Sequence, residues 1–171
     1  MIVVPVKIDW SEFTSKIKTN CDTWTKPLSE GTCNFEELDE DYQYESFAEL
    51  GRGLAKHLDE PYGKAVRWIT SLLEEAGEGI DLFEYCEPMN LEDVGVPAYS
   101  PEEMAGLFEQ AKVCSEPAFG DQIKRAWSKL PESSLEDHDV TADQFLHNVS
   151  CWARILLELE RDHSVLGFSI L

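Results

Sequence analysis

Residues 141–171 read TADQFLHNVSCWARILLELERDHSVLGFSIL, a stretch that contains the two elements on which the predicted fold depends. Thr141 followed by Gln144 is a capping box, in which each side chain bonds the backbone N–H of the other residue at a helix start. Apolar residues then recur at spacings of three and four, which predicts an amphipathic helix that continues to about Arg161. The residues of this apolar stripe are Phe145, Val149, Trp152, Ile155, Leu156 and Leu159.

The two ends of the chain both have the alternating pattern of a strand. Residues 165–171 alternate large apolar side chains with smaller ones, and residues 2–8 (IVVPVKI) alternate in a similar way. Pro5 has no N–H to donate, so the first strand is expected at an edge or a bulge. Because both strands are apolar and chain termini often lie close together, we predict that they pair in one sheet.

Helical spacing dominates the sequence between these strands. Start signals are Asp9 with Glu12 as a capping box, Pro61 in a first turn, and Ser100 followed by proline and two acids. The predicted helices before residue 141 span roughly residues 10–18, 47–58, 61–76, 101–111 and 119–130. Residues 80–86 are predicted to form another strand, and residues 19–44 an irregular surface segment.

These elements predict an α+β fold, a single helix-rich domain of residues 1–171 with a small sheet that pairs the N- and C-terminal strands. An irregular acidic segment is expected at residues 30–45, and the helices are expected to cover one face of the sheet. A chain of this length, with 43% hydrophobic residues, can bury a large core without disulfides or metal. The predicted core consists of Trp68, Ile69, Leu72, Leu107, Phe108, Ile123, Trp127, Phe145, Val149, Trp152 and Leu156.

The net charge of −20, from 34 acidic and 14 basic residues, is the most unusual property of the chain. Such a surface repels nucleic acid and anionic membrane lipids, so we expect neither as a partner. The apolar stretches are too short for a signal peptide or a transmembrane helix, and five scattered cysteines indicate reduced thiols. A cytoplasmic location is therefore expected.

The acids are also segregated along the chain. No Lys or Arg lies between Lys26 and Arg52, between Arg67 and Lys112, or between Lys129 and Arg154, and these three stretches contain 24 of the 34 acids. The densest run lies beside aromatic residues, a combination that could bind a basic protein partner through charge and a buried aromatic anchor. The alternative is that these acids are only the solvated faces of helices. The predicted partner-binding residues are Glu36, Glu37, Asp39, Glu40, Asp41, Phe35, Tyr42 and Tyr44.

The sequence contains no recognised catalytic motif and no cofactor-binding motif. Neither a GxSxG nucleophile elbow nor a glycine-rich phosphate loop is present, so no catalytic residue and no cofactor is predicted. His138 and His147, with the acids around them, could supply metal ligands, but they lack the HExxH and zinc-finger spacings. A polar loop and helix start explain them as well, and no metal site is predicted.

The C-terminal helix around WARILLELER (residues 152–161) and the HSVLGFSIL that follows (residues 163–171) resemble the close of the bacterial YfbM-like family. The short first strand, the helix after it and a central Trp-containing helix resemble that family as well. The resemblance covers about half of the chain and implies an α+β fold. The family is of uncharacterised function, so the resemblance implies no site residues.

Three functions are consistent with these observations. The chain could be an interaction protein, such as an immunity protein or inhibitor that neutralises a basic toxin or effector. It could be a YfbM-like housekeeping domain whose acidity is incidental. It could also be a metal-assisted hydrolase that uses acids with His138 or His147. The first of these is the function that the sequence favours, and it is not an enzymatic one.

Overall fold

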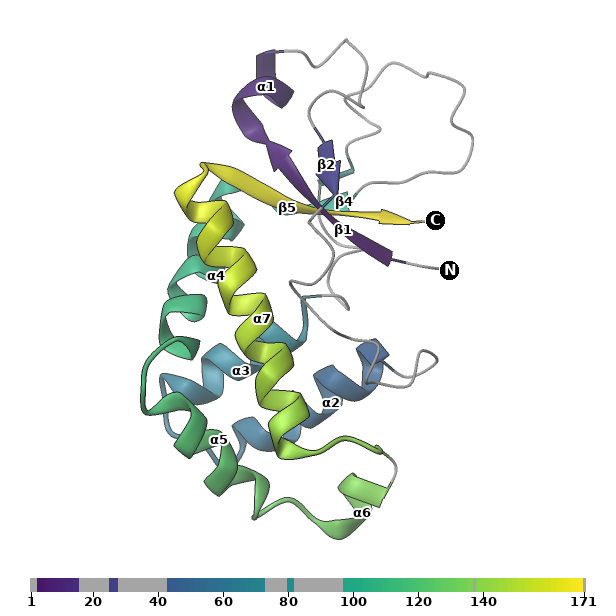
Figure 1. Cartoon of the computed structure of the whole chain (residues 1–171), viewed down its shortest axis with the longest axis vertical. Helices are drawn as coiled ribbons and strands as arrows, with labels where there is room; N and C mark the ends of the chain where they lie inside the picture. The colour runs from purple at the N-terminus through teal and green to yellow at the C-terminus, as the bar shows by residue number, and fades with distance from the viewer. Residues whose placement is uncertain are drawn as a thin grey trace.

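The computed structural model describes residues 3–15, 25–27, 43–72, 80–81, 97–136 and 138–170. Within these residues, five strands form one sheet in the order β2-β1-β5-β4-β3, and every adjacent pair is antiparallel. The strands are β1 (Val3–Asp9), β2 (Thr25–Pro27), β3 (Ile80–Asp81), β4 (Pro97–Ala98) and β5 (Ser164–Ile170). Figure 1 shows the sheet at one end of the molecule, with helices α2 to α7 extending away from it.

The central pair of the sheet joins the two ends of the chain, as the sequence predicts. β1 and β5 pair over their full length, from Val3 opposite Ile170 to Asp9 opposite Ser164. Gly167 lies opposite Val6, and a Cβ atom there would lie 2.5 Å from Cδ1 of Ile8. The absence of a side chain at Gly167 therefore leaves room for Ile8, which is fully buried.

Seven helices account for most of the remaining described residues, so the fold is helix-rich α+β. They are α1 (Trp10–Ser15), α2 (Gln43–Ala55), α3 (Tyr62–Thr70), α4 (Pro101–Cys114), α5 (Phe119–Trp127), α6 (Glu132–Glu136) and α7 (Ala142–Arg161). α7 packs against α3, α4, α5 and β5, and it lies beside α4 in Figure 1. The longest helix of the chain therefore connects the sheet to the rest of the helical part.

The predicted helix starts at both long helices are confirmed. Ser100 Oγ accepts a hydrogen bond from the backbone N–H of Glu103, and Glu103 in return accepts one from the backbone N–H of Ser100. Thr141 and Gln144 make the same reciprocal pair at the start of α7. At α1, the Asp9 carboxylate accepts from the backbone N–H of Glu12 at 3.0 Å. These bonds satisfy backbone groups that have no partner within the helix.

The core lies between the helices and the sheet. Phe145 is fully buried, and its ring lies 5.2 Å from that of Phe47 and 5.6 Å from that of Trp127, measured between centroids. The predicted core residues are buried with three exceptions. Phe108 and Trp127 are half-buried, and Trp68 is 39% exposed.

The prediction for Trp68 is wrong because of its position on α3. The buried stripe of this helix contains Ala65, Val66 and Ile69. Trp68 precedes Ile69 by one residue, which is about 100° of rotation around the helix axis. Its indole ring therefore lies beside the buried stripe and not within it.

Several element boundaries also differ from the prediction. β2 and the start of α2 lie within residues 19–44, which the sequence predicts as irregular, and β4 and α6 were not predicted. α2 ends at Ala55 and α3 at Thr70, earlier than their apolar patterns indicate. Of the strand predicted at residues 80–86, Ile80 and Asp81 are in β3, and the rest lies outside the described residues.

Candidate functional site

Most of the predicted partner-binding residues lie outside the part of the chain that the structure describes. This is true of Phe35, Glu36, Glu37, Asp39, Glu40, Asp41 and Tyr42. Tyr44 is the second residue of α2. The proposal that this acidic run contacts a partner is therefore carried by its sequence alone.

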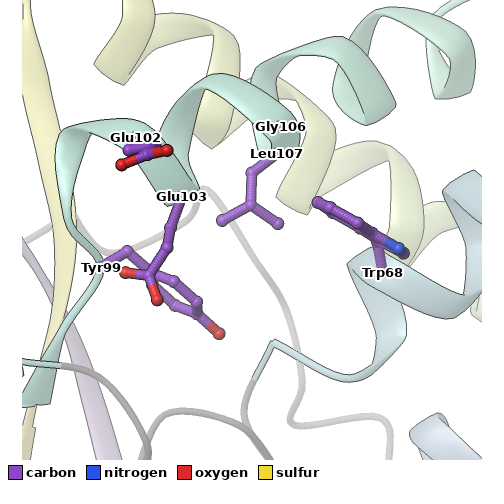
Figure 2. Close-up of a pocket in the computed structure, with 6 residues that line it drawn as sticks. All are labelled: Trp68, Tyr99, Glu102, Glu103, Gly106 and Leu107. Carbon is purple, nitrogen blue, oxygen red and sulfur yellow. The ribbon is translucent and has the colours of Figure 1, made fainter.

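A pocket of about 350 Å³ lies where α3 faces the first turns of α4. Figure 2 shows the indole ring of Trp68 at one end, the carboxylates of Glu102 and Glu103 at the other, and Leu107 between them. The residues that line the pocket are Trp68, Tyr99, Glu102, Glu103, Gly106 and Leu107. An exposed aromatic ring, an apolar floor and two acids thus share one hollow in the surface.

Gly106 is the residue of α4 that allows Trp68 to lie here. A Cβ atom at Gly106 would be 2.7 Å from Cζ3 of the indole ring, closer than any real contact of this kind. A side chain at this position would therefore displace the ring. Lys64 lies one turn earlier on α3, with its Nζ 5.0 Å from the centre of the indole ring, within the range of a cation–π interaction.

The two carboxylates of the pocket differ in how firmly they are held. Glu103 accepts the 2.7 Å hydrogen bond from the backbone N–H of Ser100, so the capping box fixes its position. Glu102 is exposed and makes no hydrogen bond or ion pair with the described residues. Tyr99 is buried, and its hydroxyl donates to the backbone oxygen of Leu72 at 2.9 Å. Glu102 is therefore the acid of this pocket best placed to bind a ligand.

The two histidines that the sequence offers as metal ligands contact different residues. His138 lies 3.5 Å from a carboxylate oxygen of Glu49 on α2, measured from its Nε2 atom. His147 lies 3.6 Å from Sγ of Cys151, one turn later on α7. Among the described residues, no three His, Cys, Asp or Glu side chains come close enough to hold a metal ion.

The two cysteines with described surroundings are both buried thiols. Burial raises the pKa of the Cys114 thiol to about 12, which keeps it protonated and unreactive at neutral pH. The apolar sequence around Cys151 predicts that this residue is buried, and the structure confirms it in α7. Cys86, for which the same context predicts burial, lies outside the described residues.

Four of the six pocket residues have other predicted roles in the sequence, and Tyr99 and Gly106 have none. The sequence predicts Trp68 and Leu107 in the core, and Glu102 and Glu103 as acids at the start of a helix. The usable signal was a tryptophan one residue out of phase with the apolar stripe of its helix. The pairing of Trp68 with Gly106 joins two helices that are distant in sequence, so it could not be predicted from local patterns.

The described residues form a helix-rich α+β fold with a surface pocket that combines an indole ring with two carboxylates. Comparisons with protein-family models, curated proteins and solved structures found no match to the chain. The resemblance to the YfbM-like family therefore stays a prediction from the sequence. None of the helices within the described residues combines the length and the apolar character needed to cross a bilayer.

Proposed function

We propose that this chain binds a basic protein partner, and that the pocket between α3 and α4 receives a Lys or Arg side chain of that partner. The observation that carries the proposal is the exposed ring of Trp68 in the same pocket as Glu102 and Glu103. An immunity protein or inhibitor of a basic effector is the class of protein in which such a pocket would be used.

The chemistry of the pocket matches both parts of a long cationic side chain. The aliphatic part of Lys or Arg packs on apolar surface, which Leu107 and the indole ring provide. The charged end can bind the carboxylate of Glu102, and an indole face attracts a cation by about 0.5–2 kcal/mol. Tryptophan is also among the residues that most often dominate the binding energy of protein interfaces.

Lys64 opposes this binding and therefore gives a test with a predicted sign. Its ammonium group lies near the same indole ring and repels an incoming cation. Replacement by glutamine, Lys64→Gln, removes this repulsion and leaves the ring in place. We expect the variant to bind a cationic probe more tightly than the wild type does.

The acidic run at residues 36–41, with Phe35, Tyr42 and Tyr44, is the second part of the proposed contact. A run of like charges acts mainly on the rate of association, because it attracts the partner before contact. Reversal of Glu37, Asp39 and Glu40 to lysine is therefore expected to slow association and to reduce its dependence on salt. The effect is screened beyond about 8–10 Å at ordinary ionic strength.

The pocket is tested with a capped, fluorescently labelled tri-arginine peptide, whose binding is followed by fluorescence anisotropy at low and high salt. Trp68→Ala and Glu102→Gln are each expected to weaken binding by roughly three- to tenfold, which corresponds to about 0.7–1.4 kcal/mol. Glu132→Gln, an exposed acid in α6 outside the pocket, is the matched control for the loss of one charge.

The comparison of Glu102→Gln with Glu132→Gln decides between a pocket and a general charge effect. Weaker binding in the first and nearly unchanged binding in the second supports the proposal. Equal losses in both variants, together with full binding by Trp68→Ala, would mean that the peptide responds only to net charge. The pocket would then have no part in binding.

A further inference from the structure

A second pocket, of about 390 Å³, lies between the end of α2 and residues from the stretch 130–138, which contains α6. The lining is unusual for so acidic a chain, because it contains two basic residues and a histidine. Two leucines form its apolar part. The residues that line it are Glu49, Leu50, Arg52, Gly53, Lys56, Leu130, Ser134 and His138. We call it the α2–α6 pocket.

The basic side chains lie together because of helical spacing. Glu49, Arg52 and Gly53 lie in the last turns of α2, and Lys56 follows directly after the helix ends at Ala55. Their spacings of three, one and three residues place them on the same side. Arg52 and Lys56 are exposed. Lys56 makes no ion pair with any residue that the structure describes, although the carboxylate of Glu49 lines the same pocket.

His138 provides a buried polar atom that lacks a partner. Its side chain is only 10% exposed, and Nε2 lies 3.5 Å from Glu49. Nδ1 is buried and has no hydrogen-bond partner among the described residues. In the tautomer whose Nε2 proton points to Glu49, Nδ1 has no proton and is a hydrogen-bond acceptor. Buried polar atoms are nearly always bonded, so this one indicates a missing donor.

Gly53 keeps the floor of the pocket open although packing does not require a glycine there. A Cβ atom at this position would lie 3.4 Å from Cδ2 of Leu130, an ordinary contact distance. Glycine within a helix is less favourable than alanine. The chain therefore has the residue that is less favourable in a helix at a position where alanine would not clash. A methyl group there would, however, occupy part of the pocket.

We propose that the α2–α6 pocket binds a small organic anion that carries a hydroxyl group, such as a hydroxycarboxylate or the phosphate ester of a polyol. The anionic oxygens bind Lys56. The hydroxyl group donates to Nδ1 of His138 after a side-chain movement exposes this buried atom to the pocket, a change that is common when a ligand binds. The carbon skeleton packs on Leu50 and Leu130. This proposal is independent of the partner-binding function and concerns a different part of the molecule.

The test uses isothermal titration of the full chain, at constant ionic strength, with malate, succinate and glycerol phosphate. Malate and succinate differ by one hydroxyl group, and glycerol phosphate replaces the carboxylates with a phosphate. We expect saturable binding of malate or of glycerol phosphate, and the tighter of the two identifies the anionic group. Succinate is expected to bind about fivefold more weakly than malate, the value of one neutral hydrogen bond.

Three variants locate the ligand. Lys56→Gln is expected to weaken binding roughly tenfold or more, because it removes a charge-assisted hydrogen bond. His138→Phe is expected to abolish the preference for malate over succinate, and Gly53→Ala to weaken binding while the protein remains folded. Lys64→Gln on α3 is the matched control, with the same change in charge at a residue that does not line this pocket.

The outcomes separate clearly. If neither malate nor glycerol phosphate binds, the proposal is wrong. It is also wrong if Lys56→Gln binds as the wild type does, or if Lys64→Gln weakens binding as much as Lys56→Gln. Should His138→Phe fail to fold in a thermal unfolding control, the comparison of Lys56→Gln with Lys64→Gln still decides the matter.

Discussion

Two glycines of α2, only two residues apart, should respond in opposite directions to the same substitution. Gly51 faces α3, and a Cβ atom there would lie 2.0 Å from Oγ1 of Thr70, 2.7 Å from its Cβ and 2.8 Å from its Cγ2. Gly53 faces the α2–α6 pocket, where a Cβ atom would meet Leu130 at 3.4 Å. Alanine is therefore too large at the first position and fits at the second.

The expected magnitudes follow from two terms. Replacement of a helical glycine by alanine gains about 1 kcal/mol at either position. At Gly51 the overpacking against Thr70 costs typically 1–3 kcal/mol, so Gly51→Ala should lower the free energy of unfolding by up to about 2 kcal/mol. Gly53→Ala should raise it by about 0.5–1 kcal/mol. In a chain of this size, a difference of about 2 kcal/mol separates the two midpoint temperatures by roughly 4–8 °C.

The measurement is urea and thermal unfolding of both variants, followed by far-ultraviolet circular dichroism. A double variant tests the cause, because Thr70→Ala removes Oγ1 and Cγ2 but leaves the Cβ atom that also lies too close to position 51. Thr70→Ala should therefore rescue Gly51→Ala only in part. If Gly51→Ala is as stable as Gly53→Ala, the close approach of α2 and α3 at Thr70 does not exist, and the packing argument is wrong.

Two further predictions concern the core and the ends of the chain. Leu156→Ala should lower the free energy of unfolding by about 2–5 kcal/mol, since Leu156 is fully buried in α7, and a loss below about 1 kcal/mol in urea unfolding would contradict that packing. The hydrogen bond from Lys7, together with its charge, lowers the pKa of the Asp162 carboxyl. The stability that this pair contributes is therefore present above the ordinary carboxyl pKa and is lost as pH falls through the lowered value. Lys7→Gln should raise the pKa of Asp162 toward its usual value in an NMR titration, and an unchanged pKa would mean that the pair does not form in solution.

The features that the sequence predicted correctly are those encoded by local spacing. Thr141 and Gln144 are three residues apart, and their reciprocal hydrogen bonds form because a helix start places them in contact. Ile155, Leu156 and Leu159 are buried because helical periodicity alone determines which face they share. The pairing of β1 with β5 is the exception, because it joins the two ends of the chain. It was inferred from the apolar character of both strands and from the tendency of chain termini to lie close together, and it is confirmed.

What the sequence could not predict depends on contacts between distant segments. Trp68 looks like a core residue because tryptophan usually is one, and only the packing of α3 against α4 shows that its ring lies at the surface. β4 contains two residues and has no periodicity to detect. Lys56 and His138 line the same pocket although they are 82 positions apart in the sequence, so no local pattern could indicate that they lie near each other.

The location of the acids explains why net charge alone could not identify a site. Of the 34 acidic residues, 15 lie outside the described residues, compared with 2 of the 14 Lys and Arg, so the described helices and strands are much closer to electrical balance than the whole chain. Long-range attraction of a basic partner must therefore come largely from the other segments, including residues 36–41.

Trp68 and Glu102, in contrast, can act only in direct contact. Reversal of the acidic run should consequently change the association rate, whereas Trp68→Ala should change mainly the dissociation rate. If both sets of variants altered only the association rate, the pocket would be no more than another part of the acidic surface.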